Sequence, residues 1–351
     1  MFNVIYNFNK IRDNFFYTEF NHQLKNGQVF PPFMVAWDCS RKCNLHCAHC
    51  GAVKEKYDKE LTTEQVKNLI DQLAVMKVRF FGATGGEPLL RRDLIEVLEY
   101  AGKKGIKTGF ATNGFFIDKK TAEKIQGAGI SSIQVSLDGT EEIHNKIRGN
   151  NLSFKRAIEA IKNLQEENIK IVSVATTVTP MNFENLKELK KLLLDLKVKR
   201  WRLCIIMPIG RANKNNLGLN SKQIRELLEF IVSNKNNIKI QVGENLPFLA
   251  EYEKKIRDAP LICPVGFTAC CIGVNGNVRG CPEMPDKKEF IEGNILKEPF
   301  SDIWKNGFKK YRKREIIISD KKCSKCKDKE NCCGGCWVMR EGNTHCIYDL
   351  L

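Results

Sequence analysis

The chain has 351 residues, of which 42% are hydrophobic, and this is enough for one domain of barrel size with a smaller second domain. Its N-terminus lacks the basic start and apolar core of a signal peptide, and no stretch approaches eighteen uninterrupted apolar residues, so we expect a cytoplasmic protein without a membrane span. The formal net charge of +16 admits nucleic acid as a partner, but the lysines are scattered along amphipathic segments and indicate solvated helix faces. We therefore do not expect nucleic-acid binding.

Strands and amphipathic helices alternate along the chain from residue 33 to about residue 235. Apolar residues recur at three- and four-residue steps between the strands, and Thr62 to Gln65 has the pattern of a capping box. The predicted strands are Phe33–Trp37, Val78–Ala83, Lys107–Ala111, Ser132–Leu137, Lys170–Thr177 and Arg200–Ile206. The predicted helices are Thr62–Lys77, Arg91–Lys104, Lys119–Gly127, Ser153–Glu167, Asn182–Leu196 and Ser221–Ser233.

This alternation predicts an α/β fold with a parallel sheet and helices outside it. A full eight-unit barrel needs about 250 residues and only about 200 are available, so the pattern favours a partial (β/α)6 TIM-like barrel. After residue 240 the helical periodicity fades, cysteines crowd the sequence, and Asn275-Gly276-Asn277 predicts a hairpin turn between short strands. We predict an N-terminal extension at 1–32, the barrel at 33–240 and a small cysteine-rich domain at 241–351.

Three cysteines, Cys43, Cys47 and Cys50, follow the first predicted strand with gaps of three and then two residues. A parallel barrel carries its active site at this end of its strands. Thiolates select iron–sulfur clusters or zinc, and three thiolates leave one iron of a four-iron cluster open to a small molecule. A zinc knuckle that also uses His46 or His49 is the structural alternative. The 15 cysteines of the chain, in a reducing compartment, indicate metal binding rather than disulfides.

The triplet resembles the signature of the radical S-adenosylmethionine (SAM) superfamily. The resemblance implies that the open iron chelates the amino and carboxyl groups of SAM. One electron then cleaves a sulfur–carbon bond, and the 5′-deoxyadenosyl radical takes a hydrogen from the substrate. The resemblance also implies that the residue before the last cysteine packs on the adenine; this residue is His49, where Tyr or Phe is commoner.

Motifs at the ends of the next two strands extend the resemblance. Gly85-Gly86-Glu87-Pro88 follows the second predicted strand, where glycines allow the backbone to approach a ligand and Glu87 supplies an acceptor. The family motif of this type binds the SAM amino group. Thr112-Asn113-Gly114 closes the third strand, and the resemblance places Asn113 at the pocket floor.

Polar residues near the fourth strand also suit SAM. Alternation along a strand puts Ser136 and Asp138 on the same side, and a hydroxyl with a carboxylate suits the two ribose hydroxyls. A plain Asp-Gly turn is the alternative. The resemblance implies that Arg148 pairs with the SAM carboxylate, a contact that suits a guanidinium, whereas the alternative is a surface arginine near a helix end.

A second group of cysteines fills the C-terminal part, and its spacing resembles the SPASM domain, which carries auxiliary iron–sulfur clusters in many radical SAM enzymes. The resemblance implies three 4Fe–4S clusters in all, and a zinc ribbon is the alternative for this region. One auxiliary cluster would use Cys263, Cys281, Cys336 and either Cys270 or Cys271, and the other would use Cys323, Cys326, Cys332 and Cys346. Cys39 is expected to be a small apolar residue of the first strand, and Cys204 and Cys333 stay without a role.

SPASM enzymes mainly modify peptides or proteins, so the resemblance implies a peptide or protein substrate, as in ribosomal peptide maturation, with flavodoxin or ferredoxin as electron donor. The stretch Trp37–Cys43, together with His49-Cys50, also resembles relatives that trim tetrapyrrole side chains in alternative heme pathways. Sulfatase-maturing enzymes carry an Asp directly after the Cys281 position, where Pro282 stands here, and this disfavours formylglycine formation. An electron-transfer protein without catalysis would not need the SAM motifs.

Overall fold

The computed structural model describes residues 26–51, 59–207, 209–243, 245–246, 248–257, 262–314, 319–341 and 346–351. Most of the predicted extension at 1–32 therefore lies outside the described residues. Within them we find no helix with the length and apolar character that crossing a membrane requires.

One ten-stranded sheet runs through the described part of the chain, in the order β10-β9-β8-β1-β2-β3-β4-β5-β6-β7. The strands from β1 to β7 are parallel neighbours in chain order, and β8 lies parallel to β1 on its other side. Because the sheet is open, the predicted partial barrel is confirmed. The barrel strands are β1 (Met34–Ser40), β2 (Phe80–Gly85), β3 (Lys107–Thr112), β4 (Ser132–Ser136), β5 (Ile171–Val178), β6 (Arg200–Ile205) and β7 (Lys239–Val242).

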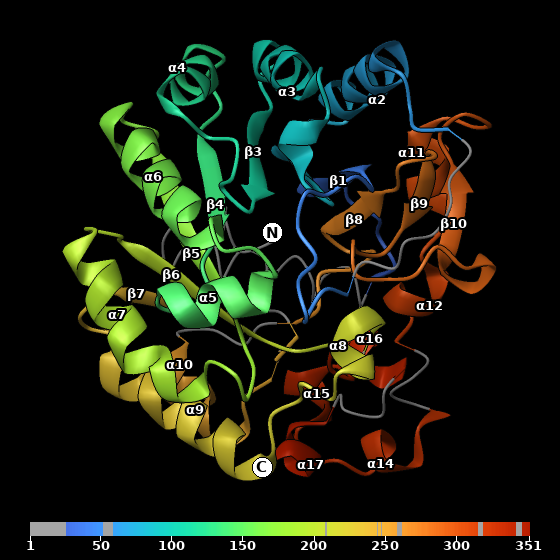
Figure 1. Cartoon of the computed structure of the whole chain (residues 1–351). Helices are drawn as coiled ribbons and strands as arrows, with labels where there is room; N and C mark the ends of the chain where they lie inside the picture. Colours follow the sequence, from blue (N-terminus) through green and yellow to red (C-terminus); the bar gives the residue numbers. More distant parts are fainter. Residues whose placement is uncertain are drawn as a thin grey trace.

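The larger helices lie outside the strands in an arc from α2 through α4 and α6 to α9 (Figure 1). In α2 four apolar residues at three- and four-residue steps, Val66, Leu69, Ile70 and Leu73, are fully buried, and the Thr62 capping box is present as predicted. Burial of each such side chain stabilises the fold by about 1.5–3 kcal/mol. The barrel helices are α2 (Thr63–Val75), α3 (Leu94–Lys103), α4 (Lys119–Gly127), α5 (Glu141–Arg148), α6 (Ser153–Glu166), α7 (Leu186–Asp195), α8 (Gly210–Lys214) and α9 (Ser221–Asn234).

Three of these elements add to the sequence prediction. The strand β7 is a seventh parallel strand and crosses the predicted domain boundary at residue 240. The helices α5 and α8 were not predicted, because eight and five residues are too few for a clear helical period. Both follow strand ends, so both lie at the edge of the sheet where we expect the active site.

The C-terminal part joins the barrel through the sheet itself. The predicted hairpin turn is confirmed, since Gly276 has φ +85° and connects β8 to β9, which pair antiparallel. A buried ion pair between Asp38 on β1 and Arg279 on β9, 3.0 Å apart, adds a second connection. The remaining elements are β8 (Ala269–Ile272), β9 (Asn277–Arg279), β10 (Ile291–Asn294), α10 (Glu253–Ile256), α11 (Phe300–Asn306), α12 (Lys309–Arg312), α14 (Lys321–Ser324), α15 (Lys329–Cys332), α16 (Trp337–Glu341) and α17 (Ile347–Leu350).

Candidate active site

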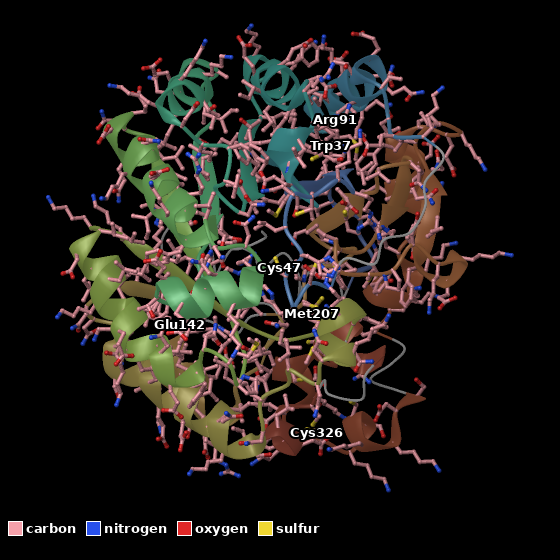
Figure 2. The ribbon with its side chains drawn as sticks, in the orientation of Figure 1. Trp37, Cys47, Arg91, Glu142, Met207 and Cys326 are labelled. Carbon is pink, nitrogen blue, oxygen red and sulfur yellow. The ribbon has the colours of Figure 1, made fainter. Side chains whose placement is uncertain are left out.

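A cavity of about 370 Å³ lies at the carboxyl ends of the barrel strands. Its walls come from the ends of β2 to β6, from the loop after β1 and from the cysteine-rich C-terminal part. Figure 2 shows two of its lining residues, Cys47 and Met207, in the middle of the molecule. This is the position at which parallel barrels carry their catalytic groups.

The triplet loop, residues 41–51, places Cys43, Cys47 and Cys50 against this cavity. Its backbone is held from two sides. The Ala48 amide donates to the Ile147 carbonyl at 2.8 Å, and Arg211 donates from Nε to the Cys47 carbonyl at 2.8 Å. The three cysteines therefore line one cavity from a backbone that is held in place, and three thiolate donors are the number that a cluster with one open iron takes.

The two glycines of the Gly85-Gly86 pair allow the end of β2 to touch the triplet loop. The Gly86 amide donates to the Ser40 carbonyl at 2.7 Å. A Cβ on Gly86 would lie 2.1 Å from the Lys42 carbonyl oxygen, and Gly85 has φ +138°. Any larger residue would push the loop away, so both glycines are required by this packing.

The predicted acceptor Glu87 lies behind the cavity wall and not in it. Its carboxylate is fully buried and accepts hydrogen bonds from Thr112 Oγ1 at 2.7 Å and from the Asn113 amide at 2.8 Å. Burial raises the pKa of Glu87, and these hydrogen bonds oppose the rise. Gly85, Gly86 and Asn113 line the cavity instead.

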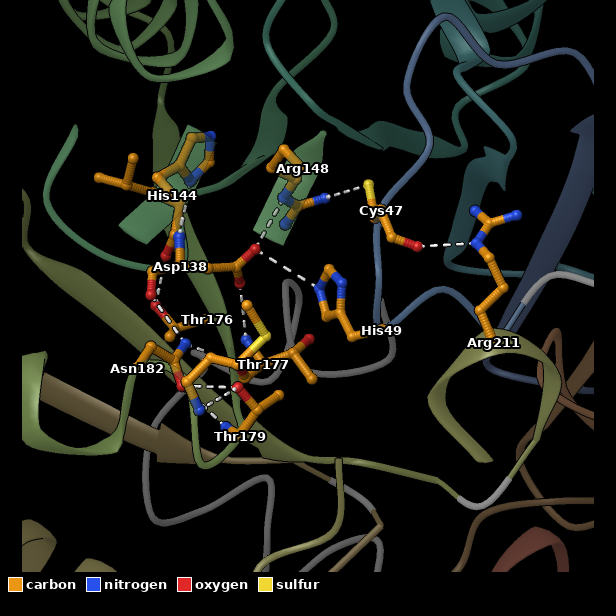
Figure 3. Close-up of polar contacts among 12 residues, drawn as sticks. Cys47, His49, Asp138, His144, Arg148, Thr176, Thr177, Thr179, Asn182 and Arg211 are labelled. Carbon is orange, nitrogen blue, oxygen red and sulfur yellow. Dashed lines mark hydrogen bonds and ion pairs between the residues drawn. The ribbon is translucent and has the colours of Figure 1, made fainter. Parts of the chain in front are cut away.

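Asp138 is also fully buried behind the wall, whereas Ser136 lines the cavity. The Asp138 carboxylate lies 2.7 Å from Arg148 Nε and 3.4 Å from His49 Nε2, as Figure 3 shows. From the other side of Asp138, its amide donates to His144 Nδ1 at 3.0 Å. Arg148 then reaches Cys47, with Nη1 3.7 Å from Sγ. The α5 helix thus connects the end of β4 to the triplet.

Burial and the ion pair between Arg148 and Asp138 set the charges of Arg148, Asp138 and His49. Burial would lower the pKa of Arg148, but Asp138 and Cys47 outweigh it and the pKa is raised. Burial lowers the pKa of His49 to about 4, which leaves its ring neutral at neutral pH. A neutral ring packed at the cavity wall is compatible with the predicted contact to an adenine.

Three C-terminal cysteines, Cys263, Cys281 and Cys336, line the same cavity as the triplet. Burial raises the pKa of Cys281, and the neighbouring Cys336 and Cys263 raise it further. Thiols grouped in this way suit a metal centre, because coordination supplies the positive charge that deprotonated thiols need. Cys270 and Cys271 are both fully buried on β8, where neighbouring side chains point to opposite faces, and neither lines the cavity.

The second predicted set, Cys323, Cys326, Cys332 and Cys346, lies in and between the short C-terminal helices and contributes nothing to the cavity lining. Figure 2 places Cys326 far from Cys47. Asp320 caps α14 by accepting from the Cys323 amide at 2.9 Å. This set is therefore a separate group of half-buried thiols near the end of the chain.

Some lining residues were missed at the sequence level. Arg202, from β6, lines the cavity, with Nη1 3.5 Å from Gln134 Oε1 on β4, and Arg41 and Glu283 line it as well. The sequence carried one signal for Arg202. It is a charged residue within a predicted parallel strand, and buried parallel strands are normally apolar throughout. Cys39 is fully buried on β1 as expected, and Cys204 lines the cavity.

Residues 37–196 match the radical SAM superfamily, and residues 263–336 match the SPASM iron–sulfur cluster-binding domain. The chain belongs to the radical SAM superfamily and is an enzyme that uses SAM and 4Fe–4S clusters. The predicted pairing of a radical SAM barrel with a SPASM domain is confirmed.

Two curated relatives are similar over most of both chains. The Fe-coproporphyrin III synthase of Methanosarcina barkeri is 30% identical over 339 residues, which cover 88% of this chain and 84% of the relative. The mycofactocin maturase MftC of Mycolicibacterium smegmatis is 30% identical over 319 residues, which cover 88% of this chain and 79% of the relative. Among solved structures, Streptococcus suis SuiB bound to its precursor peptide SuiA has a TM-score of 0.72 at 19% identity, covering 92% of this chain and 75% of that one. This last likeness supports the fold alone.

Proposed function

We propose that this enzyme removes a hydrogen atom from a peptide or protein and so modifies it. The observation that carries the proposal is that Cys43, Cys47 and Cys50 share one cavity with Cys263, Cys281 and Cys336. When bound, SAM and the cluster of the triplet supply a 5′-deoxyadenosyl radical. A substrate in this cavity would meet that radical on one side and an auxiliary cluster on the other.

The chain's own residues would bind and orient SAM in distinct ways. We assign the amino-group contact to the backbone of Gly85 and Gly86, and the ribose contact to Ser136, because these line the cavity. Arg148 lines it too and keeps a fixed orientation through Asp138, so it suits the SAM carboxylate. In this proposal Asp138 acts as a positioning residue for Arg148 and His49.

The size of the cavity favours a peptide. About 370 Å³ is at the small end of the range for sites that enclose whole small molecules. Since SAM must occupy part of this space, the room that is left suits one projecting side chain, with the rest of the substrate outside. The mycofactocin maturase among the relatives supports this choice.

A tetrapyrrole is the second candidate, and one observation favours it. Arg41, Arg148, Arg202 and Arg211 all line the cavity, and guanidinium groups bind carboxylates in a bidentate geometry. A porphyrin with carboxylate side chains would suit such a wall. The Fe-coproporphyrin III synthase is consistent with this alternative.

The test is an anaerobic assay of the reconstituted full chain with SAM and dithionite, which replaces the flavodoxin or ferredoxin that we propose as electron donor. We expect 5′-deoxyadenosine, and its absence would refute the SAM-cleaving activity. The substrate arms are co-expression with each short open reading frame beside the gene, and incubation with iron tetrapyrroles that carry carboxylate side chains, of the siroheme type as well as iron coproporphyrin III. A peptide with an altered mass supports the proposal, whereas conversion of a tetrapyrrole with every peptide unchanged would overturn it.

A further inference from the structure

Arg314 is a buried arginine between the two groups of C-terminal cysteines. It follows α12, is 3% exposed and has φ +49°, which is unusual for a residue with a side chain. Its Nη2 donates to the Cys263 carbonyl at 3.0 Å, and its Nη1 donates to the Cys333 carbonyl at 3.3 Å. The guanidinium lies 4.8 Å from the centre of the Phe267 ring. One cation thereby contacts Cys263 of the first proposed ligand set and Cys333, which directly follows Cys332 of the second set.

The charge of this side chain is permanent, because a guanidinium keeps its proton at any pH that the protein meets. A buried charge is costly unless an opposite charge lies near it. Cysteines that coordinate iron do so as thiolates, and the proposed ligands Cys263 and Cys332 would carry that negative charge close to Arg314.

We propose that Arg314 is a counter-charge shared by the two auxiliary clusters and that it raises the reduction potential of both. The inference rests on the ligand sets proposed above, in which Cys263 belongs to one cluster and Cys332 to the other. An electron from a reductant adds one negative charge to a cluster without making or breaking a bond. A fixed cation nearby therefore stabilises the reduced form, since net charge and hydrogen bonding set cluster potentials.

Arg340 provides a comparison within the same domain. Its Nη2 lies 3.1 Å from Cys323 Sγ, so it contacts the second cysteine set directly. Its Nη1 lies 3.2 Å from Asp320 Oδ2, and this carboxylate offsets its charge. We expect removal of Arg340 to change the second cluster only.

The experiment is a redox titration followed by electron paramagnetic resonance. The background is the full chain with Cys43, Cys47 and Cys50 all replaced by Ala, so that only the auxiliary clusters are titrated. In this background Arg314→Gln should lower both midpoint potentials. We expect at least a tenfold change in the ratio of reduced to oxidised cluster at fixed potential. For a one-electron couple this corresponds to a shift of about 59 mV in the midpoint potential. Arg314→Lys should retain most of the wild-type potential.

Lys309→Gln is the matched control, because it removes one positive charge from the same segment at an exposed position. Unchanged potentials in Arg314→Gln, a shift in one cluster alone or an equal shift in Lys309→Gln would overturn the proposal.

Iron content is measured throughout. If Arg314→Gln binds no iron, retention of iron and potentials by Arg314→Lys supports the role of charge, and loss of iron in both variants shows a purely structural role. A background chain without iron would refute the ligand sets, and the proposal with them, while deoxyadenosine formation by the intact chain tests the proposed function separately.

Discussion

Replacing Asp138 by Asn should destabilise the folded chain by about 3–5 kcal/mol, the usual cost of leaving a buried charge without its partner. Asp138 is fully buried and Arg148 is 9% exposed. Their 2.7 Å contact would be replaced by a neutral amide beside a guanidinium that stays charged. At this chain length 1 kcal/mol corresponds to about 2 °C, so we expect the Tm to fall by about 6–10 °C.

The measurement is thermal unfolding in anaerobic buffer, followed by the fluorescence of the buried tryptophans. Glu99→Gln is the control, because the Glu99–Lys103 pair lies on the surface and should be worth at most about 0.5 kcal/mol. The double variant Asp138→Asn/Arg148→Met should recover at least about 2 kcal/mol relative to the sum of the single variants. A loss in Asp138→Asn no larger than in the control would refute the reasoning.

The pH dependence of this effect has a definite sign. Burial would raise the pKa of Asp138, but Arg148 and the nearby histidines outweigh burial and hold the pKa below its ordinary value of 3.8. A carboxyl whose pKa is lowered by folding contributes stability above its unfolded pKa and loses it as the pH falls through the folded value. The difference in stability between wild type and Asp138→Asn should therefore be full above about pH 5 and shrink only in stronger acid.

Two further changes test the triplet loop. Cys47→Ala should abolish formation of 5′-deoxyadenosine, while iron falls from about twelve to about eight per chain and the spectra of the auxiliary clusters persist; deoxyadenosine at the wild-type rate would refute the assignment. Gly86→Ala should displace the loop and lose the iron of the triplet, because its Cβ would meet the Lys42 carbonyl at 2.1 Å. Gly102→Ala is the control, since a Cβ there meets nothing within 4 Å, and it should gain about 0.5–1 kcal/mol as an Ala inside α3. Equal iron in the Gly86 and Gly102 variants would contradict the packing argument.

The partial barrel was predictable because its pattern is local. Each helix carries its own apolar face, and each of the first six strands has five to eight residues, which is long enough to recognise. The strand β7 has four residues and α5 has eight, and neither length shows its own period clearly. Their positions are fixed by neighbours in the sheet, which the sequence does not reveal.

In the candidate site, too, the features with a local sequence pattern were predictable and those that depend on distant neighbours were not. Cysteine spacing and the Gly-Gly-Glu-Pro motif pointed to the family, since both lie within short segments. The depth of Glu87 and Asp138 depends on partners distant in sequence, such as the Asn113 amide and the Thr177 amide. Residue type thus predicted involvement in the site, but only the fold distinguishes a side chain that lines the cavity from one that supports it.

The pairing of β8 with β1 has a consequence for electron transfer. β1 leads directly into the triplet, and Cys271 on β8 lies in register with Ala36 on β1, one strand away. Neighbouring strands are separated by about 4.8 Å, a spacing that backbone hydrogen bonds keep nearly constant. The C-terminal domain is therefore attached by a stiff ladder as well as by the chain between β7 and β8. If Cys270 or Cys271 is an auxiliary ligand, the tunnelling distance between the triplet and that ligand is set by the sheet, and it should vary little when the substrate enters or leaves.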